Sequence, residues 1–334
     1  MFSLAANLIL GFTASLQGVL SPRENAIWRD IQPAMVVVMN GGQERGVAAL
    51  IDTSGLFMAS KASAGSSPIT GRLFSGKIVR LRVIAEDRFT QLILLQAQGW
   101  DRGSARPFRA PSGNAVPGDV LFAVQPFGPS RIELISANRI GVSGQSRRLI
   151  PLLELRCESQ LLTGPNVLVV GNGEVYGVVT STLGQPVPTV TANRLGGFGG
   201  GGKSAFPLNS QFQSNLGPGN LTVAYVPGLE VMRRVINGFL APDHKVLHPY
   251  LGVICRDAPG GGAMVETVVV GSGAQKAGIR IGDVIVSIGG DSVADQIGFA
   301  QVMLRQRVGD KITVTVRRGP YETILNAVVG HEAN

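Results

Sequence analysis

The polar and apolar residues after residue 33 form short runs that Gly- and Pro-containing turns separate. The clearest run is 78–85, in which Val79, Leu81 and Val83 alternate with arginines and predict one buried strand face. Apolar runs of the same kind predict further strands at 34–39, 47–52, 56–60, 91–96, 118–128 and 131–141. So many short strands predict an antiparallel barrel or sandwich rather than alternating strands and helices.

Helical spacing occurs at the end of this strand-rich region and again further on. Val231, Val235 and Phe239 are four residues apart and predict an amphipathic helix over 229–240. A second helix is expected over 296–305, inside a compact α+β module. The expected organisation is an N-terminal segment at 1–29, a strand-rich domain at 30–240, a linker at 241–248 and an α+β domain at 249–331.

Composition places the chain among globular proteins and narrows its chemistry. Of 334 residues, 44% are hydrophobic, 16% are charged and 45 are glycines, which fits strands and turns rather than disorder. The net charge of +8 comes from basic residues scattered along the chain without aromatic interleaving, so nucleic-acid binding is not expected. The two cysteines, Cys157 and Cys255, exclude a disulfide framework, and no His/Cys or acidic cluster predicts a metal or a cofactor.

Two segments depart from the strand pattern. Residues 1–22 carry no charged side chain and are moderately apolar, which predicts an export signal or a membrane anchor; a helix packed on the body or on a neighbouring subunit is the alternative. Residues 195–202 are rich in glycine and predict a long loop, without the flanking strand and helix that a nucleotide-binding loop needs. We therefore expect an exported protein, either periplasmic or membrane-associated.

The C-terminal module carries motifs that identify a family. YLGV at 250–253, VVVGSGAQKAGIRIGDVIVSIGGDSV at 268–293 and VGDKITVTVRRG at 308–319 resemble a PDZ domain almost turn by turn. Upstream, GVAALIDTSGLFMAS at 46–60 and EDRFTQLILLQ at 86–96 resemble the barrel of HtrA/Deg-type proteases. The resemblance covers nearly everything after about residue 30. It implies a mainly β protein, in which a trypsin-like double antiparallel β-barrel is followed by an α+β PDZ domain.

The resemblance also places a catalytic triad, and this chain departs from it at every position. A serine protease of this kind needs a hydroxyl nucleophile, an imidazole base and a carboxylate that orients the imidazole. The matching positions are Ala62 for the histidine, Gln91 for the aspartate, and Gly164 or Thr163 for the serine. Independently of this alignment, all three histidines of the chain lie beyond residue 240. We therefore expect an inactive homologue of a serine endopeptidase.

Two other functions stay open. Lys61, Ser63, Ser159 and Thr163 could serve a serine-type endopeptidase with rearranged catalytic groups, in which a lysine replaces the imidazole. The uncharged N-terminus and the Gly-rich loop favour a structural subunit of a membrane-associated complex. Because the family forms trimers, the resemblance also implies a homotrimer or a subunit of a larger complex.

Peptide binding is the activity that the resemblance assigns to the PDZ domain. An extended peptide, often a protein C-terminus, adds a strand to such a domain and places its carboxylate on free backbone N–H groups. The matching residues are Tyr250, Leu251, Gly252, Val253 and Ile254 for the carboxylate turn and strand edge, with Phe299 and Met303 on one helix face. We expect an apolar pocket formed by Leu251, Val253, Phe299 and Met303, and a protein that acts as a scaffold by binding other proteins.

Overall fold

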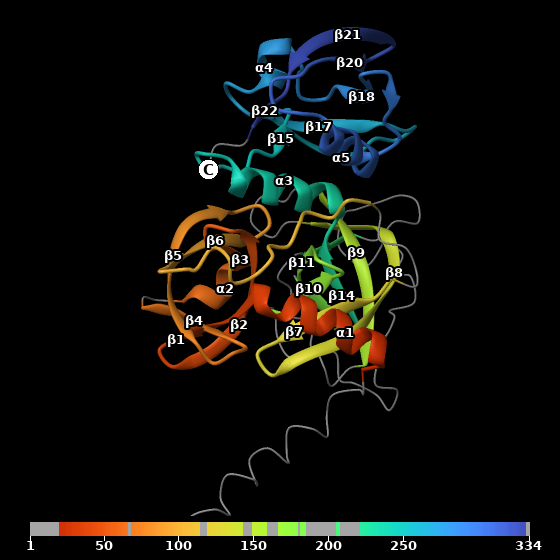
Figure 1. The fold of residues 1–334 in the computed structure, drawn as a ribbon. Coiled ribbons are helices and arrows are strands. Elements are labelled where there is room, and N and C mark those ends of the chain that lie inside the picture. Colours follow the sequence, from red (N-terminus) through yellow and green to blue (C-terminus); the bar gives the residue numbers. More distant parts are fainter. Residues whose placement is uncertain are drawn as a thin grey trace, which may run out of the picture. The chain divides into compact units, whose positions relative to one another are not determined.

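A computed structural model describes residues 20–65, 68–113, 119–142, 149–158, 166–179, 181–184, 205–207 and 221–331. The chain divides into two compact units. The first comprises Met1–Asn138, Leu152–Val187 and Leu208–His244, and the second Arg139–Pro151, Pro188–Pro207 and Lys245–Asn334. Strands dominate both units (Figure 1).

An amphipathic helix, α1 (Pro22–Ile31), precedes the first strand. Ser21 caps it, because its hydroxyl accepts a hydrogen bond from a backbone N–H of the first turn. Trp28 makes edge-on ring contacts with Phe74 and Phe122, at centroid distances of 5.4 and 6.3 Å. The export signal or anchor predicted at 1–22 lies almost wholly outside the described residues. Among the residues that are described, no helix has both the length and the apolarity needed to cross a bilayer.

Six strands close into a barrel in the order β1-β2-β3-β6-β5-β4. The strands are β1 (Met35–Asn40), β2 (Gln43–Asp52), β3 (Leu56–Ser60), β4 (Ile69–Leu73), β5 (Ile78–Asp87) and β6 (Leu92–Gln98). Aliphatic side chains such as Val38, Leu50 and Leu94 are fully buried in this barrel. The strands predicted at 34–39, 47–52, 56–60 and 91–96 are therefore confirmed, each within a few residues.

The alternation predicted for β5 is confirmed in part. Val79 and Leu81 are buried, as expected, but Val83 is 40% exposed, so the prediction of one apolar face is wrong at its end. A bulge follows directly, between Val83 and Ala85, where an extra residue enters the pairing with β6. A bulge changes the side-chain alternation in a way that the hydrophobic pattern alone does not reveal.

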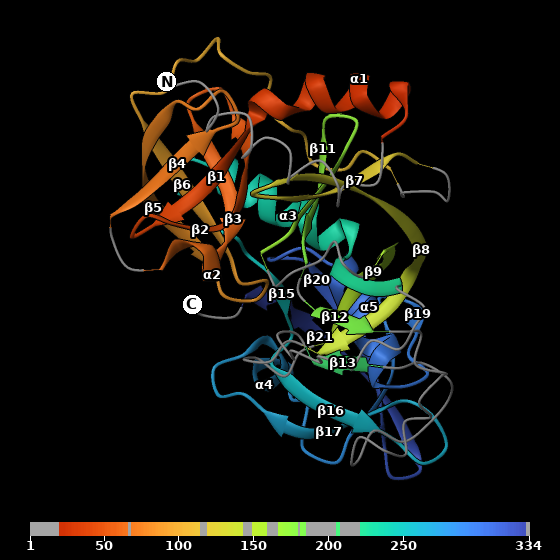
Figure 2. The ribbon, with the colours of Figure 1, turned by 90° about the horizontal axis from the view of Figure 1, so that it is seen from below.

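A second sheet follows the first barrel. Its order is β11-β10-β7-β8-β9-β14-β12, and β13 pairs with β8 in parallel. Figure 2 shows β11 of this sheet beside a helix, α3 (Leu229–Leu240). Its strands are β7 (Leu121–Gln125), β8 (Gly128–Val142), β9 (Leu149–Glu158), β10 (Leu168–Gly171), β11 (Glu174–Val178), β12 (Ser181–Gly184), β13 (Ala205–Pro207) and β14 (Leu221–Pro227). Leu155, Val169 and Val226 belong to its buried core. The Gly-rich segment 195–202 lies outside the described residues.

Three helical elements belong to the same region: the 3-10 turn η1 (Gln32–Ala34), α2 (Lys61–Ala64) and α3 (Leu229–Leu240). The last confirms the predicted helix, and Val231, Val235 and Phe239 are all fully buried. An apolar face repeated every four residues therefore gave the bounds of α3 correctly.

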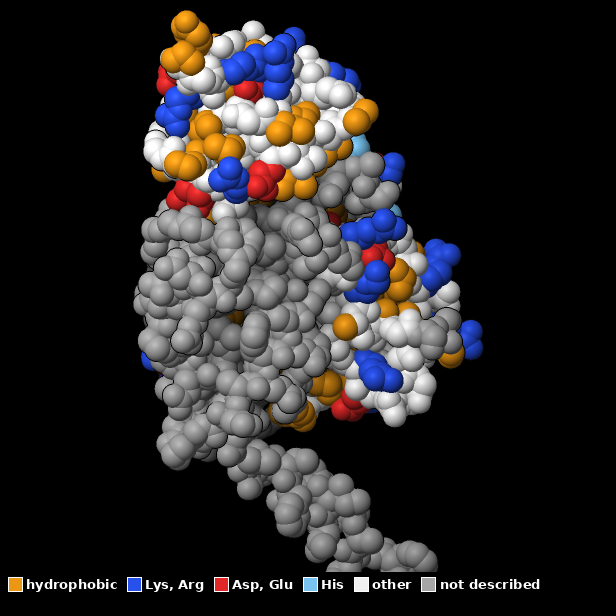
Figure 3. Space-filling model, turned by 180° about the vertical axis from the view of Figure 1, so that it is seen from behind, with side chains coloured by type: hydrophobic (Ala, Val, Ile, Leu, Met, Phe, Trp, Pro, Cys, Tyr) orange, Lys and Arg blue, Asp and Glu red, His pale blue; other side chains and the backbone are white. Residues whose placement is uncertain are grey.

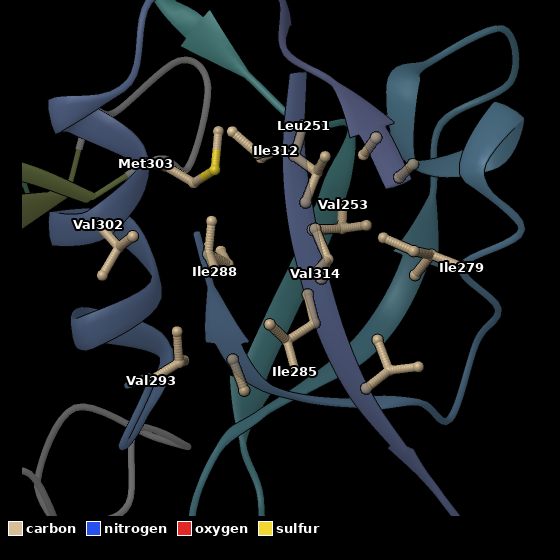
Figure 4. Packing of buried hydrophobic residues seen from close by; sticks show 14 of the residues in the cluster. Leu251, Val253, Ile279, Ile285, Ile288, Val293, Val302, Met303, Ile312 and Val314 are labelled. Atoms are coloured by element: carbon tan, nitrogen blue, oxygen red, sulfur yellow. The ribbon is translucent and has the colours of Figure 1, made fainter. Parts of the chain in front are cut away.

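The C-terminal module contains a sheet in the order β16-β17-β18-β20-β21, with β19 beside β18 and a separate β15–β22 pair. Its elements are β15 (Pro249–Tyr250), β16 (Val253–Asp257), β17 (Ala263–Val268), α4 (Gly273–Ala277), β18 (Val284–Ile288), β19 (Asp291–Ser292), α5 (Gln296–Arg305), β20 (Lys311–Arg318), β21 (Tyr321–Val328) and β22 (Gly330–His331). Ile285, Val314 and Met303 belong to its apolar core (Figure 4). The helix predicted at 296–305 is confirmed.

Candidate functional site

The structure brings the positions matching the histidine and the aspartate of the triad together. Ala62 lies in α2, directly after β3, and Gln91 lies directly before β6. The Lys61 N–H donates to the Gln91 carbonyl at 2.9 Å, and Ser60 pairs with Leu92 in the β3–β6 ladder. The two chain segments are therefore neighbours, as a triad would require.

Neither position offers a group that can carry a proton at neutral pH. Ala62 has only a methyl side chain, and its N–H donates to the Ser60 hydroxyl at 3.2 Å. Gln91 has a left-handed backbone, with φ of 59°, and its side-chain amide donates to the Arg88 carbonyl at 2.7 Å. Both residues thus contribute to the local turn rather than to a proton relay.

The predicted nucleophile positions, Thr163 and Gly164, lie outside the described residues. Asn166 is the first described residue after them, and its side-chain amide donates to the Arg45 carbonyl at 2.7 Å. A Cβ placed on Gly46 would lie 2.7 Å from the Asn166 Cβ and 3.3 Å from the Ser63 Cβ. The segment that begins at Asn166, directly after the nucleophile positions, therefore starts close to α2. Sequence reasoning missed Asn166, because nothing local signals its contact with a residue 121 positions earlier.

The residues proposed for a rearranged enzyme have other partners in the structure. The Lys61 ammonium pairs with Glu86 at 2.5 Å, and the Lys61 side chain is 47% exposed. Ser63 is fully buried, and its hydroxyl donates to the Ser60 carbonyl at 2.6 Å. Ser159 lies outside the described residues. Lys61 and Ser63 thus each have a structural partner, and among the described residues no hydrogen bond joins their two side chains.

The predicted peptide-binding residues gather at one edge of the C-terminal sheet. β16 is the edge strand and pairs only with β17, while α5 packs against β15, β16 and β17. The Asp257 carboxylate accepts a 2.9 Å hydrogen bond from the Gln296 N–H, which joins the end of β16 to the start of α5. An edge strand beside a helix is the arrangement to which an extended peptide adds a strand.

Free backbone donors lie in the turn that precedes β16. Within the described residues, the N–H groups of Leu251 and Gly252 donate no hydrogen bond, whereas both carbonyls accept one, from Ala274 and Val269. Gly252 has φ of 93°, in the left-handed region. Two adjacent N–H groups without an acceptor can receive a carboxylate.

The predicted pocket residues pack into the core of the module. Leu251, Val253 and Met303 are 1%, 7% and 5% exposed, and Phe299 packs against the same cluster while partly exposed. Figure 4 shows Leu251 and Val253 near Ile312 and Val314, with Met303 reaching from α5 toward Ile312. These side chains form the core as well as the wall that a terminal apolar side chain would meet, and Phe299 is the most accessible of the four.

Known proteins resemble this chain in sequence. Residues 249–327 match the PDZ domain family. The "Serine protease Do-like HtrB" of Bacillus subtilis is 24% identical over 286 residues, which cover 79% of this chain and 57% of that protein. The "Probable periplasmic serine endoprotease DegP-like" of Marinomonas sp. is 24% identical over 214 residues, which cover 55% of this chain and 45% of that protein. The chain thus spans about half the length of these curated relatives.

Solved structures of HtrA-type proteases share the fold. "HtrA-type protease AlgW with decapeptide" gives a TM-score of 0.63 at 15% identity, over 94% of this chain and 100% of that chain. The serine endoprotease from Yersinia pestis gives 0.59 at 18% identity, over 95% and 100%. This chain is an HtrA-type homologue with a C-terminal PDZ domain. The predicted family and the mainly β fold are therefore confirmed.

Charge is dispersed over the surface of this HtrA-type homologue. On the face drawn in Figure 3, Lys and Arg side chains occur in both coloured parts, several of them beside Asp or Glu side chains. No group of three or more His, Cys, Asp or Glu side chains able to hold a metal ion occurs in the described ranges. The expectation that nucleic acid is not a partner stays a prediction.

Cys255 of the homologue lies on the edge strand β16, and its thiol should react slowly. Burial, helped by the nearby Glu266 carboxylate, raises the pKa of the Cys255 thiol to about 12, so little thiolate exists at pH 8. We expect iodoacetamide at pH 8 to leave Cys255 largely unmodified in the folded protein and to modify it rapidly in urea. The Cys157→Ser variant removes the other cysteine, so mass spectrometry then measures the modification of Cys255 alone. Equal rates with and without urea would contradict the raised pKa.

Proposed function

We propose that this HtrA-type homologue binds the C-terminal segments of other proteins through its PDZ domain and does not hydrolyse peptide bonds. The observation that carries the binding half is the pair of N–H groups at Leu251 and Gly252, which have no acceptor among the described residues. They lie at the start of the edge strand β16, so a carboxylate held there would align its peptide along that strand. Tyr250, Val253, Ile254, Phe299 and Met303 complete the proposed site.

The non-catalytic half rests on the chemistry of proton transfer. Acyl transfer by a serine or threonine needs a base within hydrogen-bond reach of the hydroxyl. The three histidines are His244, His248 and His331, all beyond α3 in the sequence. Pro165 follows the proposed nucleophile positions, where its ring restricts the backbone and leaves no N–H to donate. We infer that the barrel has lost the base, its orienting carboxylate and the nucleophile together.

A rearranged endopeptidase is the weaker alternative. A lysine base works when it is neutral, which burial away from carboxylates favours. Lys61 instead pairs with Glu86 and is 47% exposed, so its ammonium contacts a carboxylate rather than a hydroxyl that it could activate. This contact supports a structural role for Lys61.

The roles of the domains, the assembly of the protein and its location in the cell are proposals as well. The double barrel at 30–240 would be an assembly platform, with a linker at 241–248 and the PDZ domain at 249–331. A homotrimer, a larger complex, and membrane association through 1–22 are proposals from family resemblance and from the uncharged N-terminus. Export to a periplasm is proposed because one relative is named a periplasmic endoprotease.

Activity is tested directly with unfolded casein and a fluorophosphonate probe. We expect no cleavage and no labelling, because no hydroxyl has a base to activate it. An active HtrA-type protease assayed in parallel is the positive control. Thr163→Ala and Lys61→Ala variants identify the source of any signal: cleavage and labelling that both variants abolish would establish the rearranged enzyme and overturn the proposal.

A further inference from the structure

The outer face of β16 carries an apolar surface that the family motif does not explain. Along this strand Val253 points into the core, being 7% exposed, whereas Ile254 is 48% exposed. Val269 follows β17 and is 37% exposed, and the next residue, Val270, is 84% exposed. We define Ile254 and Val269 as the outer strip.

The pairing of β16 with β17 places the strip on one side of the sheet. Val253 pairs with Val268, Ile254 pairs with Thr267, and the Val269 N–H donates to the Gly252 carbonyl at 2.8 Å. Residues that pair directly point to the same face, and alternate residues point to opposite faces. Ile254 and Val269 therefore share the outer face as diagonal neighbours, opposite to the core-facing Val253 and Val268.

A bound C-terminus has a defined register against this strand. Its carboxylate lies at the Leu251–Gly252 turn, at the N-terminal end of β16, so the peptide runs antiparallel to β16. The terminal residue then lies opposite Val253 and points toward the core side, where Phe299 is accessible. The penultimate residue lies opposite Ile254 and points outward, onto the outer strip.

We propose that the site selects peptides whose penultimate residue is apolar, so that the ligand ends in two consecutive apolar residues. This inference rests on the proposed peptide binding and adds the class of ligand. An apolar penultimate side chain would cover Ile254 and Val269, which are otherwise exposed to water. Further upstream the outer face changes character, because Arg256 pairs with Glu266 at 3.1 Å. Because the two charges neutralise each other, we expect no preference for a charged or an apolar side chain at the peptide position two residues before the penultimate one.

The test uses the full chain and fluorescein-labelled heptapeptides with a free carboxylate. All peptides end in Val and differ only at the penultimate residue, which is Leu, Ala, Ser or Asp. Fluorescence anisotropy should show the Leu peptide binding about tenfold more tightly than the Ser and Asp peptides, since partial burial of one aliphatic side chain supplies an effect of that size. An amidated Leu peptide should bind at least tenfold more weakly, because the carboxylate is lost.

Two variants assign the preference to the strip. Ile254→Ser should reduce the Leu-over-Ser preference to about twofold or less. Ile324→Ser is the matched control, because Ile324 is 69% exposed on β21, at the opposite edge of the same sheet, and should leave the preference unchanged. Equal affinity for all penultimate residues, with carboxylate dependence intact, would overturn this inference and leave peptide binding standing. Failure of every carboxylate peptide to bind would overturn both.

Discussion

Replacing Gly252 with alanine should abolish peptide binding and destabilise the PDZ domain by about 3 kcal/mol. Two costs combine at this position. The backbone φ of 93° lies in the left-handed region that an L side chain rarely adopts. A Cβ there would also lie 2.1 Å from the Ser272 Cβ and 2.4 Å from its hydroxyl, distances that no packing tolerates. The turn must move, and with it the two N–H groups proposed to hold the carboxylate.

The steric part of this effect can be separated from the backbone part. Gly260→Ala is the matched control: its φ is 85°, but no atom lies within 4 Å of the added Cβ, so a loss of only about 1 kcal/mol is expected. Adding Ser272→Gly to Gly252→Ala removes the clashing side chain at the expense of one helix cap on α4. The double variant should therefore be more stable than Gly252→Ala alone. If the double variant loses as much free energy of unfolding as the two single variants together, Ser272 is not the obstacle.

The measurement has an internal reference. Both tryptophans, Trp28 and Trp100, lie in the barrel unit, so their fluorescence during urea unfolding follows that unit. Hydrogen exchange of peptides from 249–331 follows the PDZ domain. Gly252→Ala should accelerate exchange throughout 249–331 and leave the tryptophan transition unchanged.

Regular periodicity was enough to predict the regular elements. The helix at α3 was bounded correctly because Val231, Val235 and Phe239 repeat on one face, and that face is buried. The prediction for β5 was wrong at Val83, which is 40% exposed, and the strand has a bulge directly after it that was not predicted. Strand alternation is a local signal, whereas a bulge depends on how the neighbouring strand pairs.

The site was predictable where a motif carried it and unpredictable where contacts were long-range. The turn at Leu251–Gly252 follows from the YLGV motif, and the apolar character of Leu251 and Met303 is compatible with both a pocket and a core; in the structure both are buried in the core. The short helix α2 was missed, because four residues held by a Ser60 cap produce no periodicity. The buried Asp87 was missed as well; its carboxylate accepts hydrogen bonds from the Thr90 hydroxyl at 2.5 Å and from its N–H at 3.2 Å. It thereby shapes the turn that presents Gln91.

Replacing Asp283 with asparagine should destabilise the PDZ domain by about 2 kcal/mol, because a buried carboxylate loses the charge that strengthens its hydrogen bonds. Asp283 is 1% exposed. Its two carboxylate oxygens accept from the Arg318 guanidinium at 2.7 and 2.8 Å, and one also accepts from the Arg280 N–H at 2.8 Å. An asparagine presents an N–H₂ group to these donors on one side and leaves the guanidinium without its charge partner.

The same carboxylate makes the stability of the domain depend on pH. Burial alone raises the pKa of Asp283, but the Arg318 hydrogen bonds and the Arg280 N–H outweigh it and hold the pKa below its ordinary value. The unfolded chain then binds a proton more readily than the folded one. This stabilisation is fully present above the unfolded pKa of about 4, and it is lost as the pH falls through the lower folded value.

Asp291→Asn is the control, because it makes the same substitution in an exposed ion pair. Asp291 pairs with Arg305 at 2.9 Å in the same domain, but the two side chains are 54% and 61% exposed, so its loss should cost less than about 1 kcal/mol. Hydrogen exchange of 249–331, measured at pH 7 and again between pH 5 and pH 3, compares the variants. The difference between wild type and Asp283→Asn should be largest at pH 7 and should shrink toward pH 3, because acid protonates the Asp283 carboxylate of the unfolded wild-type chain before that of the folded one. A difference that stays constant over this range would mean that Asp283 acts by shape alone, without its charge.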